Sequence, residues 1–194
     1  MARPPSDTSY PGRGRFTQLA TPPADNGTFD PTVFCPPLIF GPWVHPLGAS
    51  GLDPLNDSNH QIGDIIYGDF RSSQIPQAIA PLWVDVRDVA LAHVKAALQL
   101  DPSRPSSDER YTICSPEKFD YHLVWEIIRE GFPGWNEEVL PPREERPPFE
   151  NISLDGTPGT KDLGVKYRCF RVCIVDVARQ LRAEVLREVE GDRP

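Results

Sequence analysis

The side chains best suited to chemistry in this sequence are four cysteines, and their spacing does not match a metal or redox motif. No two of them form a CxxC pair, and none lies at a metal-type spacing from a histidine. Cys169 and Cys173 are four residues apart on one face of a predicted helix, so a metal or redox pair stays open there as an alternative. We favour small buried apolar side chains in a reducing compartment. The four are Cys35, Cys114, Cys169 and Cys173.

Histidines and one charged trio are the other candidates for proton transfer. His45 and His60 could act as general bases, but the sequence places no nucleophile or carboxylate beside either, which favours surface histidines. His93 falls on an apolar helix stripe, where we expect a hydrogen bond to a buried carbonyl. The run DVRD (85–88) sets two acids around Arg87 at a predicted helix start, which indicates a helix cap and an ion pair.

The composition of the chain limits the classes of protein to which it can belong. The chain has 194 residues, the length of one ordinary domain, and its 28 acidic against 20 basic residues give a net charge of −8. Such an acidic surface repels phosphate backbones, so we expect no nucleic acid partner. The N-terminal residues contain no apolar signal segment, and no apolar run reaches the ~18 residues that span a bilayer. These features predict a soluble, cytoplasmic protein without membrane contact.

Short strands alternate with helices after a leader. Residues 1–31 are rich in proline and have no helical or alternating period, so we expect a disordered leader. Strands are predicted at 32–35, 82–84 and 110–114. Helices are predicted from about 57 to 67, 85 to 100, 120 to 130 and 170 to 189. The segments between them, including 43–57 and 133–159, are expected to be loops. This order predicts the α/β class with a small sheet.

Two of the predicted helices have an apolar stripe at helical spacing, which is typical of a face that packs on the core. In the helix that begins near Asp85, the stripe consists of Val86, Val89, Ala90, His93, Ala97 and Leu100. In the last helix it consists of Phe170, Cys173, Ile174, Val177, Leu181 and Val185.

Five segments of the chain form a recognisable set. They are CPPLIFGP (35–42), LNDSN (55–59), PLWVDVRDVALAH (81–93), RYTICS (110–115) and LGVKYR (163–168). Their order and spacing resemble the C-terminal half of extended short-chain dehydrogenase/reductases, in the dihydroflavonol-reductase-like branch that includes fungal methylglyoxal and ketone reductases. The resemblance implies an α/β fold over residues 32–190: the C-terminal half of a Rossmann-like NAD(P)-binding fold with a small substrate-domain portion.

Two motifs of that family are missing here. Family members bind the dinucleotide with a glycine-rich turn after the first strand and protonate the carbonyl with a Tyr-x-x-x-Lys pair. No GxxG of this sequence extends to a third glycine, and none of its five tyrosines has a lysine four residues later. We therefore expect a chain that lacks the N-terminal Rossmann half, has no catalytic residue of its own and binds a dinucleotide no tighter than millimolar.

The resemblance also implies site residues. The segment that begins at Cys35, where the family more often has Asn, would pass beside the nicotinamide ring. The implied cofactor contacts are Cys35, Pro36, Leu38, Ile39 and Ser58. Alternatives stay open, because Pro36 could simply end a strand and Ser58 could cap a helix. The implied contacts to an apolar ketone or aldehyde are Trp43, His45, Tyr67 and Phe70. No metal site is implied.

The function that the resemblance implies is NAD(P)H-dependent reduction of a ketone or aldehyde, with NADP or NAD as cofactor, in a pathway such as secondary metabolism. An alternative is an inactive half-domain that acts by binding a partner chain that supplies the Rossmann half, or a homo-oligomer. An epimerase or dehydratase of the same superfamily shares the scaffold. The strings VDVRDVALAH (84–93) and RYTIC (110–114) favour the reductase branch.

Overall fold

The computed structural model describes residues 32–45, 55–67, 75, 78, 80–98, 109–135 and 152–191. The predicted leader at 1–31, and the parts of the predicted loops at 46–54 and 136–150, lie outside these described residues.

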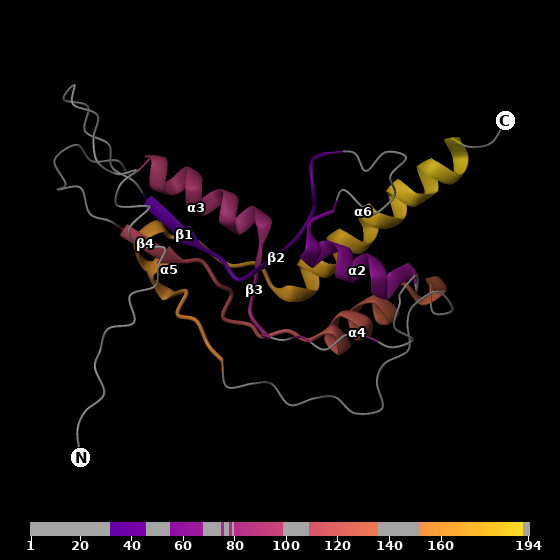
Figure 1. Cartoon of the computed structure of the whole chain (residues 1–194), viewed down its shortest axis with the longest axis horizontal. Helices are drawn as coiled ribbons and strands as arrows, with labels where there is room; N and C mark the ends of the chain where they lie inside the picture. Colours follow the sequence, from indigo (N-terminus) through magenta and orange to yellow (C-terminus); the bar gives the residue numbers. More distant parts are fainter. Residues whose placement is uncertain are drawn as a thin grey trace, which may run out of the picture.

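Strands and helices alternate along the described chain, in the α/β class that the sequence predicts (Figure 1). The elements, in order, are β1 (Thr32–Cys35), β2 (Leu38–Phe40), α2 (Asp57–Tyr67), β3 (Trp83–Asp85), α3 (Val86–Leu98), β4 (Glu109–Thr112), α4 (Tyr121–Gly131), the short 3-10 helix η2 (Pro133–Trp135), α5 (Thr157–Leu163) and α6 (Phe170–Gly191). The three predicted strands and four predicted helices are all present, with ends shifted by a few residues.

Two elements correct the sequence expectation. Residues 38–40, which are not among the predicted strands, form β2, because the chain resumes an extended course after Pro36-Pro37 and pairs with β3. α5 begins within the predicted loop 133–159 and extends beyond it to Leu163. It is only seven residues long, too short for an apolar period, and it starts with a proline in its first turn and ends at Gly164 in the left-handed conformation.

The strands form two parallel pairs. β1 pairs with β4, with Thr32 opposite Glu109, and β2 pairs with β3, with Leu38 opposite Trp83. In each pair the strands are far apart in sequence and a helix or loop crosses between them, as parallel strands require. Pro36 and Pro37 lie between β1 and β2 and separate the two pairs. The described sheet is therefore small, as predicted, but it is divided in two.

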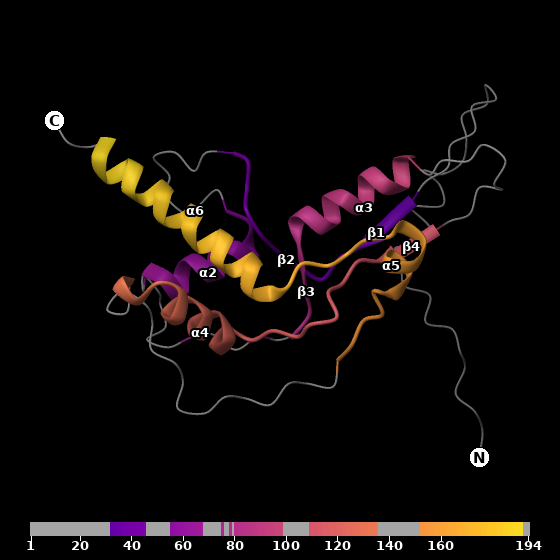
Figure 2. The ribbon, with the colours of Figure 1, turned by 180° about the vertical axis from the view of Figure 1, so that it is seen from behind.

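The described residues form two hydrophobic clusters, and the β2–β3 pair contributes side chains to both. The larger one joins α2, α4 and α6 to β2 and β3, and its fully buried large side chains include Trp83, Phe40 and Phe119. Phe119 packs edge-on to Phe40 at 5.0 Å between ring centroids. The smaller cluster joins β1, β4, α3 and α5 to Val84 of β3 and Ile39 of β2. In both ribbon views β2 and β3 lie centrally, with α2, α4 and α6 to one side and β1, β4, α3 and α5 to the other (Figures 1 and 2).

The N-terminal cap of α4 shows how local sequence fixes an element. Asp120 precedes the helix and its side chain accepts a hydrogen bond from the backbone N–H of Leu123 at 2.7 Å. Val124, Ile127 and Ile128 are buried, as their spacing predicts, whereas Leu123 is half-buried. Gly131 is the last helical residue, and Phe132 follows as the C-terminal cap.

In α6 the predicted stripe is confirmed from Phe170 to Leu181, with Val185 half-buried near the end. In α3 the predicted stripe is wrong. The buried residues of α3 are Asp88 and Ala92, and three stripe members are exposed: Ala90, His93 and Ala97. Leu100 lies outside the described residues.

His93 has no buried partner. Its Nδ1 pairs with the carbonyl of Val89 in its own helix at 2.8 Å, in an exposed position, and its ring packs on Phe34 of β1. The helix is rotated because a buried carboxylate, Asp88, takes the inward position, which a pattern of apolar residues does not reveal.

Within the described residues, no helix is both long enough and apolar enough to cross a bilayer.

Candidate functional site

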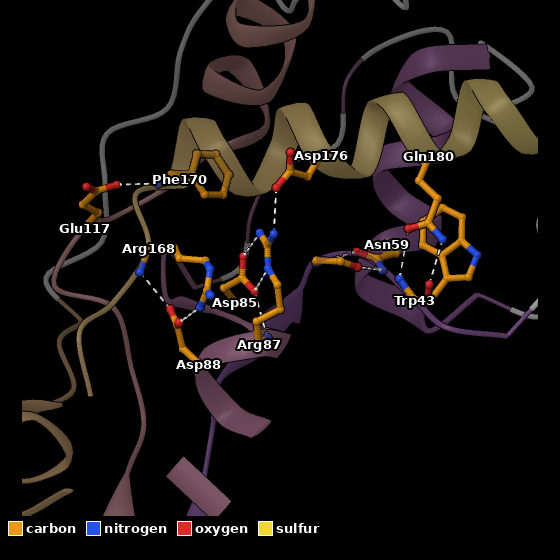
Figure 3. Close-up of polar contacts among 11 residues, drawn as sticks. Trp43, Asn59, Asp85, Arg87, Asp88, Glu117, Arg168, Phe170, Asp176 and Gln180 are labelled. Carbon is orange, nitrogen blue, oxygen red and sulfur yellow. Dashed lines mark hydrogen bonds and ion pairs between the residues drawn. The ribbon is translucent and has the colours of Figure 1, made fainter. Parts of the chain in front are cut away.

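The carboxyl ends of β2 and β3 lie together because these strands are parallel neighbours. In α/β sheets, ligands bind beyond the carboxyl ends of the strands. Gly41 directly follows β2 with a φ of +132°, which favours glycine, and a Cβ there would lie 2.8 Å from Cγ1 of Val86. The chain segments that leave the two strands are therefore in close contact. The polar side chains around them define the candidate site (Figure 3).

Asp85 is a fully buried carboxylate at this edge. It accepts hydrogen bonds from the backbone N–H of Arg87 at 2.8 Å and from Nη2 of Arg87 at 2.6 Å. Nη1 of Arg87 donates to Asp176 of α6 at 2.7 Å. Burial alone would raise the pKa of Asp85, but the hydrogen bonds and charge of Arg87 outweigh it and hold that pKa below its usual value. The predicted cap and ion pair are confirmed.

A second buried carboxylate, Asp88, connects α3 to the segment before α6. It accepts the backbone N–H of Arg168 at 2.8 Å and forms an ion pair with the Arg168 guanidinium. Burial raises the pKa of Asp88 more than the contacts with Arg168 lower it. Two residues later, the backbone N–H of Phe170 donates to the carboxylate of Glu117 at 2.8 Å. The start of α6 is thus held by α3 and by the segment after β4.

Amide side chains of α2 and its N-terminus hold the end of β2. Nδ2 of Asn56 donates to the carbonyl of Ile39 at 3.0 Å. Asn59 makes two bonds to Gly41: its Nδ2 donates to the carbonyl at 2.7 Å, and its Oδ1 accepts the N–H at 3.2 Å. The LNDSN segment (55–59) therefore contacts β2 through its asparagines. From the sequence we expected Ser58, which lies between the two asparagines, to be the functional residue of this segment.

Gln180 of α6 holds the chain from the opposite side. Its Oε1 accepts the backbone N–H of Trp43 at 3.1 Å, and its Nε2 donates to the carbonyl of Trp43 at 2.7 Å. In Figure 3, Asn59 and Gln180 make hydrogen bonds to neighbouring parts of the segment that follows β2. Because 137 residues separate Gln180 from Trp43, no local pattern could have indicated this contact. Paired amide bonds on both sides make the Gly41–Trp43 segment a fixed platform.

The cysteines are all free thiols, and their burial differs. Cys114 and Cys173 are buried, as expected, but Cys35 and Cys169 are exposed. Burial, reinforced by the nearby charge of Asp85, raises the pKa of Cys173. Cys169 precedes α6, so it does not share a helical face with Cys173. In the described part of the chain, no group of three or more histidine, cysteine or acidic side chains could hold a metal ion.

The residues predicted to meet the cofactor lie in two places. Cys35 ends β1 in an exposed position, and Pro36 is half-buried beside it. Leu38 and Ile39 are half-buried on β2 and pack on different clusters, Leu38 on the larger and Ile39 on the smaller. Ser58 is buried in the first turn of α2, with 6% of its surface exposed. The first four are brought together by the β1–β2 connection, whereas Ser58 lies on a different element.

The residues predicted to meet the substrate are spread around the carboxyl end of β2. Trp43 is half-buried, packs on the larger cluster and has its indole Nε1 buried. His45 is exposed two residues further on. Tyr67 ends α2 and also packs on the larger cluster. Phe70 lies outside the described residues.

One histidine has a partner that the sequence analysis overlooked. Nδ1 of His60 lies 3.1 Å from Oδ1 of Asp64, one helical turn further along α2. Asp64 is buried, and the burial of Tyr121, followed by the charge of Asp64, raises the pKa of the Tyr121 phenol. The expectation that no carboxylate accompanies His60 is therefore wrong, although the four-residue spacing in a predicted helix could have revealed the pair.

The chain is similar to several known reductases. It is 33% identical over 159 residues to ketoreductase azaE of Aspergillus niger, a match that covers 81% of this chain and 45% of that protein. It is 31% identical to an uncharacterised oxidoreductase of Schizosaccharomyces pombe, covering 81% and 44%. No protein-family model matches the chain.

Solved structures give the same result. The crystal structure of Gre2 from Candida albicans matches with a TM-score of 0.65 and 25% identity, over 89% of this chain and 48% of that one. Yeast methylglyoxal/isovaleraldehyde reductase Gre2, solved with NADPH, has the same fold with a TM-score of 0.62 at 24% identity. It covers 93% of this chain and 48% of that structure.

The relatives and structure neighbours of the chain are NAD(P)-dependent reductases. These matches are consistent with the C-terminal half of an extended short-chain dehydrogenase/reductase, as the sequence resemblance implies. It spans about half the length of the curated relatives that it matches.

Proposed function

We propose that the chain forms the substrate-side half of an NAD(P)H-dependent reductase of ketones or aldehydes. The observation that carries the proposal is the Gly41–Trp43 platform, fixed by paired amides at the carboxyl ends of two parallel strands. Ligands of α/β proteins bind at such an edge. The similarity to a ketoreductase over 81% of the chain supports carbonyl reduction as the chemistry.

The nicotinamide end of the cofactor is the part that these residues suit. Cys35 is exposed where β1 ends, and the half-buried Pro36, Leu38 and Ile39 follow it as apolar residues that a nicotinamide ring could contact. A bound nicotinamide would supply the hydride. Because Ser58 is buried, its side chain would influence the cofactor only indirectly, through the N-terminus of α2. The sequence holds no glycine-rich phosphate turn, so the pyrophosphate would be bound by a different half.

The substrate would lie beside the platform. Trp43 and Tyr67 offer apolar ring surface, and His45 follows in an exposed position. Phe70 is kept as a contact on the basis of the family resemblance. An apolar ketone or aldehyde fits these side chains. The cofactor would be NADP or NAD, and two Gre2 structures of this fold contain NADPH. A role in secondary metabolism follows only from the fungal resemblance.

Proton transfer would depend on the other half. None of the tyrosines has a lysine four residues later, and burial raises the pKa of both Tyr121 and Tyr167, which makes each a poorer acid. Catalysis therefore needs a dinucleotide-binding half that also supplies the acid.

The test is turnover by reassembled halves. We would refold residues 1–194 together with the N-terminal half of the Aspergillus niger ketoreductase and follow NADPH oxidation with isovaleraldehyde, methylglyoxal and a panel of apolar ketones. We expect turnover by the mixture and none by either half. A mixture that binds NADPH but reduces no carbonyl compound would show that the proposed function is wrong.

A further inference from the structure

We propose that Trp43 is a specificity-determining residue, whose indole Nε1–H donates a hydrogen bond to a substrate oxygen other than the carbonyl that is reduced. The substrate class is then ketones or aldehydes that carry a second acceptor oxygen, such as an ether, ester or hydroxyl oxygen. This inference rests on the proposed function, in which Trp43 contributes only apolar ring surface, and it identifies the substrate class of that same site.

The indole N–H of Trp43 is a buried donor. Its Nε1 atom has no hydrogen-bond partner among the residues that the structure describes. Buried tryptophan N–H groups usually have one, as Trp83 does, whose Nε1 donates to the carbonyl of Glu117 at 2.9 Å. A buried donor without a partner lowers stability, so its presence beside a candidate site needs an explanation. An acceptor atom on a bound substrate provides one.

The backbone of Trp43 is fixed, which restricts how the indole can turn. Oε1 of Gln180 accepts the Trp43 N–H at 3.1 Å, and Nε2 of Gln180 donates to the Trp43 carbonyl at 2.7 Å (Figure 3). The half-buried ring packs on the larger cluster. The donor is therefore ordered and desolvated in the free chain. An acceptor that reaches it forms the bond without a further loss of side-chain freedom, which favours affinity.

The position of Trp43 and the chemistry of indole define the ligand atom. Trp43 lies two residues beyond Gly41, at the carboxyl ends of the parallel pair β2 and β3, where α/β proteins bind ligands. An indole N–H can only donate, so the ligand atom must be an acceptor. In the proposed function the other half supplies the acid that protonates the reacting carbonyl. The Trp43 donor is therefore left for a different oxygen of the substrate.

The first experiment follows the indole N–H signals of nitrogen-labelled residues 1–194 by heteronuclear NMR. The chain has four tryptophans, and Trp43→Phe identifies the Trp43 signal by its loss. The probes are methoxyacetone and methyl propyl ketone, in which a methylene replaces the ether oxygen. Methyl acetoacetate and methyl levulinate place their second oxygens further from the ketone. We expect a saturable shift of the Trp43 signal with at least one oxygen-bearing ketone, a much smaller shift with methyl propyl ketone, and an unmoved Trp135 signal.

The second experiment measures selectivity in the reassembled halves. The readout is kcat/KM for the oxygen-bearing ketone with the largest NMR shift, divided by kcat/KM for methyl propyl ketone. We expect this ratio to fall by about tenfold in Trp43→Phe, which keeps an aromatic ring but removes the N–H. It should stay constant in the control Trp135→Phe, whose ring packs on the same cluster. Intrinsic ketone reactivity cancels between variants, and thermal unfolding checks that each variant folds.

Two results would overturn the inference. One is a Trp43 signal that responds to no oxygen-bearing ketone more than to methyl propyl ketone. The other is a selectivity ratio that Trp43→Phe leaves unchanged. Carbonyl reduction without any dependence on a second oxygen would reject this inference and leave the proposed function standing. An oxygen-dependent shift of the Trp43 signal without turnover by the reassembled halves would support Trp43 as a binding residue and reject the proposed function.

Discussion

Asp85 stays charged while fully buried because Arg87 donates one backbone and two side-chain hydrogen bonds to it. Asp176 balances the remaining positive charge from α6. A buried ion pair of this kind gives little net stability over an apolar pair, but removing one partner leaves an uncompensated buried charge. The consequence is a rigid junction between β3, α3 and α6 beside the candidate site.

We predict that Asp85→Asn lowers the free energy of unfolding by about 3–5 kcal/mol at neutral pH. The amide keeps an acceptor for the Arg87 N–H but removes the negative charge. As a control, Glu184→Gln breaks an exposed ion pair with Arg187 and should cost less than about 1 kcal/mol. Urea unfolding of both variants measures the difference, and equal effects would contradict a special role for Asp85.

The pH dependence of this effect has a definite sign. The pKa of Asp85 in the folded protein lies below the ordinary value of 3.8, so its stabilising contribution is present above pH 3.8 and is lost as pH falls through the folded pKa. Asp88 has the opposite sign, because its raised pKa favours the protonated folded form. The stability gap between the unaltered chain and Asp85→Asn should therefore shrink in acid. A gap that stays constant from neutral pH to below pH 3.8 would refute this prediction.

Gln180 gives a second prediction at this scale. Gln180→Ala removes both bonds to Trp43 and leaves two backbone groups unpaired, so the free energy of unfolding should fall by about 1–3 kcal/mol. Arg179→Ala changes the exposed neighbour on the same helix and should have little effect. Thermal unfolding compares the two, and an equal melting temperature would show that the platform does not depend on Gln180.

Only the local part of these contacts could be predicted from the sequence. The cap and ion pair of Asp85 and Arg87 could be predicted because they are two residues apart at a helix start. The contacts of Asp176, Gln180 and Arg168 connect residues 80 or more positions apart, and they depend on where α6 packs. No spacing rule describes such contacts, so the platform that carries the proposed function could not be foreseen.

At the scale of elements, a strong local signal in the sequence was sufficient to predict a helix or strand, whereas a weak signal was not. The N-cap residue Asp120 and the apolar stripe of α6 made these two helices predictable from the sequence, because capping and periodicity depend on residues only a few positions apart. β2 has only three residues and exists because β3 pairs with it. The inner face of α3 was predicted wrongly because a buried Asp88 replaced an apolar residue as its anchor.

The packing of α5 against the end of β4 leads to a prediction. A Cβ added at Gly156 would lie 2.2 Å from the carbonyl oxygen of Cys114, a backbone atom that cannot move aside, whereas Gly134 has nothing within 4 Å. Gly156→Ala should therefore destabilise the fold by about 1–3 kcal/mol or more. Gly134→Ala, the matched control, should be neutral or slightly stabilising. Denaturant unfolding of the two variants decides, and a neutral Gly156→Ala would contradict the described packing.

At the scale of the whole molecule, the chain has two clusters and two short strand pairs, joined by the Pro36-Pro37 connection and by α6. It matches about half of a reductase, and the family resemblance could be inferred from five short segments. What those segments could not indicate is which surfaces stay uncovered, because exposure depends on the complete packing. The exposure of Val94 and Leu98 on α3 emerged only from the structure.

The most direct test of the proposed half-site is an NADPH titration of residues 1–194, followed by melting temperature and nicotinamide fluorescence. A specific ligand at a hundredfold excess over Kd stabilises the folded state by about 2.7 kcal/mol. We predict no saturable shift for the chain alone at sub-millimolar NADPH, and a clear shift once the N-terminal half of the Aspergillus niger ketoreductase is refolded with it. Saturable binding by the chain alone would contradict the claim that it holds only the nicotinamide and substrate side of the site.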